Sequence, residues 1–147
     1  MRSVLCVVDL SESSVRVLEV AARMAYANKT HLTILFPYRL ISYAYKEDIS
    51  KLKGKLEQEA REKFSVIQKQ VEILNNISFE FHPEIGFAVD RINSYVRQNN
   101  VDMIVISQTQ ANSINEVNFT ALQNLIASSK TPFTIVPAEI NAEISSQ

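Results

Sequence analysis

The chain has 147 residues, of which 46% are hydrophobic and 21% are charged, and this is the composition of a single ordinary globular domain. Its net charge is −1 and its basic residues form no cluster, which argues against a nucleic-acid partner. Cys6 is the only cysteine, so disulfides within the chain and cysteine-rich metal sites are excluded.

The apolar runs of the sequence are too short for a signal sequence or a membrane helix. The first run stops at Asp9, short of a signal h-region, and no run approaches the ~20 apolar residues that span a bilayer. We therefore expect a cytoplasmic protein with no membrane partner.

The first third of the chain predicts a strand, a helix and a second strand. The apolar run at residues 4–8 is short enough for a strand, and the chain then turns. Ser11 is the expected N-cap of a helix over residues 15–26, where apolar residues recur at helical spacing. Residues 31–36 predict the second strand, which we expect Pro37 to stop.

A long helix follows an irregular aromatic segment. Residues 37–46 contain Tyr38, Tyr43 and Tyr45 without a clear period, and they either line a ligand pocket or cover an end of the sheet. From residue 49 to residue 74, apolar residues recur at steps of three and four, which predicts one amphipathic helix.

The second half of the chain predicts three strands and two helices. Residues 77–82 alternate between apolar and polar, the pattern of a half-exposed edge strand. A helix follows, with Ala88, Ile92 and Val96 on one face, and it should end near Asn99 and Asn100. Residues 101–107 contain an unbroken apolar run, typical of a strand buried on both faces. After a polar, glycine-free loop at residues 107–120, we expect a short helix and a last strand at residues 132–136.

Five strands alternating with four helices predict an α/β fold. We expect a single doubly wound, five-stranded parallel sheet in the order 3-2-1-4-5, with two helices on each face, in a Rossmann-like arrangement. The domain should span residues 1–138, with a polar tail at residues 139–147. The switch point of this order lies between the first and fourth strands, beside Asp9 and Ser107, and ligands of such sheets bind there.

The order of these segments resembles the universal stress protein family. The resemblance rests on DLSESS at residues 9–14 before an alanine-rich helix, EIG at 84–86, VDMIVI at 101–106 and KTP at 130–132. It spans residues 2–137. It implies a domain that pairs with a second copy through its fifth strand, here Phe133, Thr134, Ile135 and Val136.

In nucleotide-binding members, the resemblance further implies a glycine-rich phosphate loop after the fourth strand. Its glycines fall here at Ser107, Gln110 and Phe119, and only Thr120, at the hydroxyl position, keeps the family's residue type. Glycines in such a loop let backbone N–H groups approach phosphate oxygens, whereas larger side chains fill that space. We expect Phe119 to be a core residue that plugs the phosphate position.

The candidate nucleotide-binding residues are Asp9, Ser107, Thr109, Gln110 and Thr120. The resemblance places Asp9 against an adenine, but this carboxylate is equally suited to cap the following helix, and Ser107 and Thr109 are suited to satisfy backbone groups at a strand end. His31 and His82 have no second ligand at metal spacing, so no metal site is expected. No Ser–His–Asp arrangement indicates a hydrolase, and we expect no enzymatic activity.

Two functions remain open from the sequence. The first is a dimeric stress-response protein that acts through contacts with other proteins and has no cofactor. The second is an adenine-nucleotide sensor that binds ATP or AMP through a remodelled loop.

Overall fold

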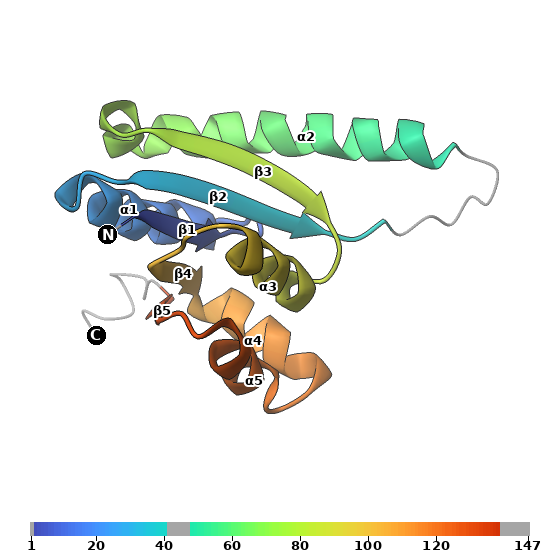
Figure 1. Ribbon diagram of the computed structural model, residues 1–147. Helices are drawn as coiled ribbons and strands as arrows, with labels where there is room; N and C mark the ends of the chain where they lie inside the picture. The colour runs from blue at the N-terminus through green and yellow to red at the C-terminus, as the bar shows by residue number, and fades with distance from the viewer. Residues whose placement is uncertain (1, 41–47, 139–147) are drawn as a thin grey trace, which may run out of the picture.

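Five parallel strands form one sheet at the centre of the molecule. The computed structural model describes residues 2–40 and 48–138. The strands are β1 (Ser3–Val7), β2 (His31–Tyr38), β3 (Phe79–Ile85), β4 (Met103–Ser107) and β5 (Phe133–Val136). They lie in the order β3-β2-β1-β4-β5, with β3 and β5 at the edges (Figure 1). The predicted strand order and both predicted edge strands are therefore confirmed.

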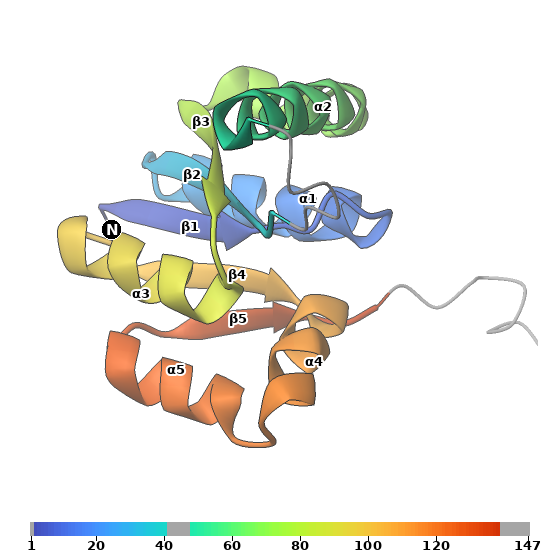
Figure 2. The ribbon, with the colours of Figure 1, turned by 90° about the vertical axis from the view of Figure 1, so that its right-hand side faces the viewer.

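The helices cover both faces of the sheet, but unequally. They are α1 (Ser13–Ala27), α2 (Ile49–Gln70), a 3-10 turn (Glu72–Asn76), α3 (Ala88–Gln98), α4 (Gln108–Val117) and α5 (Ala121–Ser129). The buried apolar residues of α1 and most of those of α2 belong to one core cluster, and the buried apolar residues of α3, α4 and α5 belong to the other. Both views show α2 beyond β3 at the top and α5 below β5 at the bottom (Figures 1 and 2). The expectation of two helices per face missed α4, which gives one face three helices.

The second strand runs two residues beyond its predicted end. Its pairing with β1 ends at Leu35, but its pairing with β3 continues to Tyr38. Leu32 N donates to Ser78 O of the β3 side, and Val8 N donates to Leu35 O from the β1 side. In a parallel ladder the next donor to Val8 O is the N–H of residue 37, which proline lacks. Pairing with β1 therefore stops there, while β2 continues beside β3, where Pro37 lies opposite Glu84.

The long predicted helix is shorter than expected. α2 ends at Gln70, and Val71 leads into the 3-10 turn that contains the buried Leu74. The buried residues of α2 are Ala60, Phe64 and Ile67. The ring of Phe64 stacks on the ring of Phe81 in β3, with 4.4 Å between the ring centroids. The helix thus covers the edge strand of the sheet.

Gly86 forms the turn from β3 into α3. Its φ of +138° lies in the region that favours glycine, and a Cβ at this position would lie 2.9 Å from Arg91 Nε. Gly86 N also donates to Tyr38 O at the end of β2. The turn therefore brings the start of α3 back over the carboxyl ends of the strands.

Some predictions concern residues outside the described part of the chain. These are Tyr43 and Tyr45 of the aromatic segment and the polar tail at residues 139–147. Within the described residues, no helix has the length and apolarity needed to cross a membrane.

Candidate functional site

The turn after β1 is ordered by the carboxylate of Asp9. Asp9 Oδ1 accepts hydrogen bonds from Ser11 N at 2.9 Å, Ser11 Oγ at 2.6 Å and Ser14 Oγ at 3.2 Å. The predicted N-cap is wrong, because α1 begins at Ser13 after Glu12 and Ser11 bonds to Asp9 instead. The Asp9 carboxylate thus fixes the path of the chain from β1 into α1.

The segment after β4 is a helix, not the predicted loop. Ser107 caps α4, since its Oγ accepts from Gln110 N at 3.1 Å. Ala111 and Ile114 bury the inner side of this helix against the sheet. Two apolar residues three apart hold α4 in place, although most of its other residues are polar.

Gln110 joins the ends of the two central strands. Its side chain is 7% exposed, and Nε2 donates to Val8 O at 3.3 Å. This carbonyl is the one that Pro37 leaves without a ladder donor. The side-chain amide therefore replaces a missing backbone bond and brings α4 against the turn at Asp9.

A cavity of about 460 Å³ lies at this junction. It is bounded by the carboxyl ends of β1 and β2, the first turn of α3 and the inner side of α4. Its lining residues are Asp9, Pro37, Phe87, Ala88, Val89, Asp90, Gln110, Ser113, Ile114, Val117 and Ala121. The lining is mostly apolar, and its charged members are two carboxylates; none of these described lining residues is Lys or Arg.

Phe87 forms the exposed edge of the cavity. Its ring is half exposed, and the Arg39 guanidinium lies over it at 4.3 Å from the ring centroid. A cation–π contact of this length holds Arg39 beside the cavity rather than in its lining.

The structure brings together two of the five predicted nucleotide-binding residues, because Asp9 and Gln110 both line the cavity. Ser107 is buried as the cap of α4, and Thr109 is exposed on the first turn of that helix. Thr120 lies before α5, where its hydroxyl bonds to Asn118 Oδ1. These three are not among the residues that line the cavity.

The prediction that Phe119 is a core residue is wrong. Its side chain is 92% exposed, and the nearby Val117 is 84% exposed. Val117 is the last residue of α4 and Phe119 lies in the turn that leads to α5, where the chain is farthest from the sheet. Gln110, and not Phe119, is the large side chain that fills the end of the cavity.

A cluster of two histidines and a glutamate, which no pattern in the sequence indicates, lies on the face of the sheet that α3 covers. His31 Nε2 and His82 Nε2 lie 3.2 Å and 3.0 Å from the two carboxylate oxygens of Glu80. The hydrogen bond from His82 is the main cause that lowers the pKa of Glu80, with a further contribution from His31. The alternation of residues 78–82 places Glu80 and His82 on one face, but only the register of β2 and β3 brings His31 to them. In the described part of the chain, no group of side chains is arranged to hold a metal ion.

Cys6 lies in the middle of β1 and is fully buried. Burial raises the pKa of its thiol well above the ordinary range. It is a small core residue, as its apolar surroundings in the sequence indicate.

The parallel sheet in the order β3-β2-β1-β4-β5, with a cavity beside the switch point between β1 and β4, defines a doubly wound α/β fold. The model of the universal stress protein family matches residues 1–137 of the chain. The chain therefore belongs to the universal stress protein family.

Solved structures of this family share the fold at low sequence identity. A universal stress protein in complex with cAMP is 19% identical, with a TM-score of 0.70, and the match covers 92% of this chain and 96% of that one. The universal stress protein UspA from Lactobacillus plantarum is 18% identical, with a TM-score of 0.68 and coverage of 92% and 97%. A family protein from Arabidopsis thaliana with AMP bound is 16% identical, with a TM-score of 0.61 and coverage of 98% and 95%. No curated protein matches the sequence significantly.

Proposed function

We propose that this protein is a dimeric universal stress protein that acts through protein contacts and does not bind ATP tightly. The observation that carries the proposal is α4, which begins directly after β4, where the family resemblance implies a glycine-rich phosphate loop in nucleotide-binding members. In this helix the N–H of Gln110 already bonds to Ser107 Oγ, and its side chain closes the end of the cavity.

The charges of the cavity also disfavour a polyphosphate. Asp9 and Asp90 contribute two carboxylates, and none of the described lining residues offers an ammonium or guanidinium group. Phosphate sites in proteins combine free backbone N–H groups with cationic side chains, because both stabilise the negative charge. The described lining offers a triphosphate no cationic side chain, and the uncapped backbone N–H groups of the first turn of α3 lie beside the carboxylate of Asp90.

Calorimetric titration with ATP and AMP tests this part of the proposal. We expect millimolar or absent binding. The 260/280 nm absorbance ratio of the purified protein is an additional test, because the chain has no Trp and only five Tyr, and bound adenine would raise the ratio visibly. Binding of ATP at micromolar concentration would refute the proposal.

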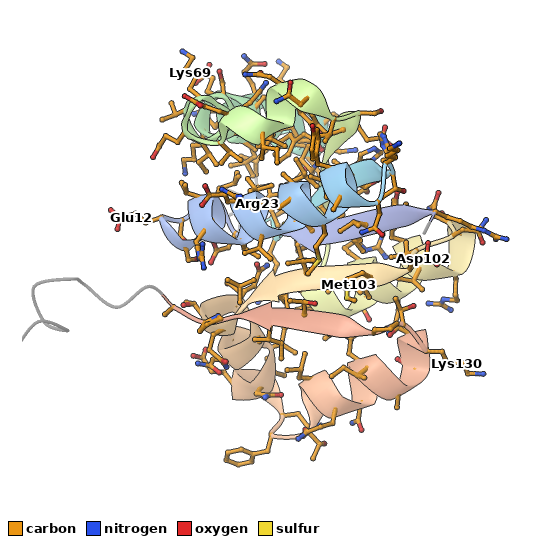
Figure 3. The ribbon with its side chains drawn as sticks, turned by 90° about the vertical axis from the view of Figure 1, so that its left-hand side faces the viewer. Glu12, Arg23, Lys69, Asp102, Met103 and Lys130 are labelled. Atoms are coloured by element: carbon orange, nitrogen blue, oxygen red, sulfur yellow. The ribbon has the colours of Figure 1, made fainter. Side chains whose placement is uncertain are left out.

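The open edge of β5 supports the dimer. Ile104 N donates to Pro132 O, so positions 132, 134 and 136 face β4, and the backbone groups of Phe133 and Ile135 point to the open side. Such an edge pairs readily with another strand, and a twofold axis would pair two copies of β5. Figure 3 shows the region of Met103 and β5 with α1 lying above it.

The substitution Ile135→Pro removes the outward N–H without removing a bond to β4, and Ile135→Val is its matched control. We expect light scattering after size-exclusion chromatography to give a dimer for wild type and I135V and a monomer for I135P. A wild-type monomer at high micromolar concentration would exclude the dimer.

A second candidate function is the binding of an adenine nucleotide in the cavity. The position of the cavity at the switch point favours it, as do family members with bound cAMP, AMP and dAMP. The same titration decides between the two, and crystals grown with excess ATP would show the ligand between Asp9 and α4.

A further inference from the structure

We propose that the cavity between α3 and α4 binds a small organic cation, an aromatic or apolar body that carries a protonated amine. The inference rests on the proposed function, in which this cavity does not hold a polyphosphate. It assigns the cavity a ligand whose charge is opposite to that of a nucleotide.

The polar side chains of the lining present free acceptors, whereas its free donors are the backbone N–H groups in the first turn of α3. Gln110 donates through Nε2 to Val8 O, which leaves its Oε1 as an acceptor. Ser113 Oγ donates its proton to Thr109 O at 3.3 Å, so this hydroxyl too offers lone pairs. The three hydrogen bonds described for Asp9 all reach Oδ1, and its Oδ2 accepts none from the described residues. An ammonium group has three donors and no acceptor, which complements such a lining.

The charges agree with the hydrogen-bonding pattern. Asp9 and Asp90 are far apart in the sequence but line one cavity, and the guanidinium of Arg39 lies over the ring of Phe87 at the edge of that cavity. Asp90 also lies in the first turn of α3, where it offsets the positive end of that helix. That negative charge makes the start of α3 less favourable for an anion.

The remaining lining suits an apolar body. Pro37, Phe87, Val89, Ile114 and Val117 bring apolar surface to a cavity of about 460 Å³, which lies within the range of small-molecule sites. Phe87 and Val117 are both exposed at its edge, so a ligand that enters would cover apolar surface that now faces water.

Three probes with the same indole ring test the proposal: tryptamine, the neutral alcohol tryptophol and the anion indole-3-acetate. We expect tryptamine to bind about two- to fivefold more tightly than either of the others, as measured by calorimetry, because Asp9 and Asp90 are exposed and exposed ion pairs contribute only about that factor. Amide shift mapping should place the bound probe at residues of α3 and α4 that line the cavity.

Three charge-removing variants distinguish the cavity from the surface. Asp9→Asn keeps Oδ1 as an acceptor for Ser11 and Ser14, and Asp90→Asn keeps the shape of the second carboxylate. We expect each of these to weaken tryptamine several-fold, whereas Glu116→Gln, on the exposed side of α4 and outside the lining, should change it less than about twofold.

Equal binding of the three probes, tighter binding of indole-3-acetate, or no saturable binding of tryptamine at about 1 mM would overturn the inference. So would an equal loss in E116Q and in the two cavity variants. A parallel titration with ATP separates the two proposals: if ATP and tryptamine both fail to bind, the inference alone falls, and if ATP binds tightly, the proposed function falls.

Discussion

Substitution of Gln110 by alanine tests the contact that joins α4 to the central strands. The side chain is 7% exposed, and its amide is the donor that Val8 O receives in place of the N–H that Pro37 lacks. Gln110→Ala removes this bond, deprives a strand-end carbonyl of its partner and opens a space at the end of the cavity. A net hydrogen bond contributes about 1 kcal/mol, and the loss of a partner for a buried group costs about 1–3 kcal/mol. We therefore expect the free energy of unfolding to fall by about 1–2 kcal/mol.

Gln108→Ala is the matched control for this substitution. Gln108 lies in the same first turn of α4, but it is exposed and bonds only to the nearby Asn112 at 2.9 Å. Both substitutions change helix propensity equally, so their difference isolates the contact with Val8. Urea unfolding should show a loss below about 0.5 kcal/mol for Q108A, and the Tm of Q110A should lie about 2–8 °C below that of wild type.

Equal stability of Q110A and Q108A would refute this reasoning. The same variant also examines the steric argument about nucleotides. If Gln110 is the main obstacle to a phosphate group, Q110A should bind AMP more tightly than wild type; if the two carboxylates dominate, its affinity for AMP should remain millimolar or absent. Titration of both proteins with AMP separates these causes.

Three further predictions concern the glycines, Glu80 and Cys6. Gly54→Ala, inside α2 with open space around its Cβ position, should raise the free energy of unfolding by about 0.5–1 kcal/mol. Gly86→Ala should lower it by at least about 1 kcal/mol, because φ at this position is +138°. Changes of the same sign in urea unfolding of the two variants would contradict this. The hydrogen bond from His82 lowers the pKa of Glu80, so the ionised carboxylate stabilises the folded protein. Wild type should therefore be more stable than Glu80→Gln above the ordinary pKa of 4.5, and this difference should disappear as pH falls through the lowered pKa. Its size should stay below about 1 kcal/mol, since half of the carboxylate side chain is exposed, and a difference between wild type and E80Q that grew on acidification would contradict it. Cys6 should react with a thiol reagent in urea but not in the folded protein, and rapid labelling of the native protein would show that β1 opens readily.

The strands and their order could be predicted from the sequence because each rests on a local pattern. Runs of four or five apolar residues require burial on both faces, and the alternation at residues 77–82 requires one exposed face. Strand–helix alternation with right-handed crossovers then leaves few possible orders. The predicted end of the second strand at Pro37 was too early. Pro37 fits within β2 because β1 no longer pairs with β2 at this position, so no ladder hydrogen bond needs its N–H.

The candidate site was only partly predictable. The switch-point rule placed Asp9 beside the end of β4, and the glycine-free segment after Ser107 indicated an altered loop. Two large residues in that segment were then expected to fill the same space. The structure separates them, because Gln110 is buried in the first turn of α4 and Phe119 is exposed beyond its end.

The sequence alone determined the fold class, the two edge strands and the burial of Cys6, because hydrophobic periodicity reports directly which faces exclude water. The tertiary structure alone decided that residues 108–117 form a helix, that Gln110 supplies the donor missing at Pro37, and that His31 meets Glu80 across two strands. These features depend on contacts between residues about 50–100 positions apart, and such contacts are set by strand register and helix packing rather than by any local pattern.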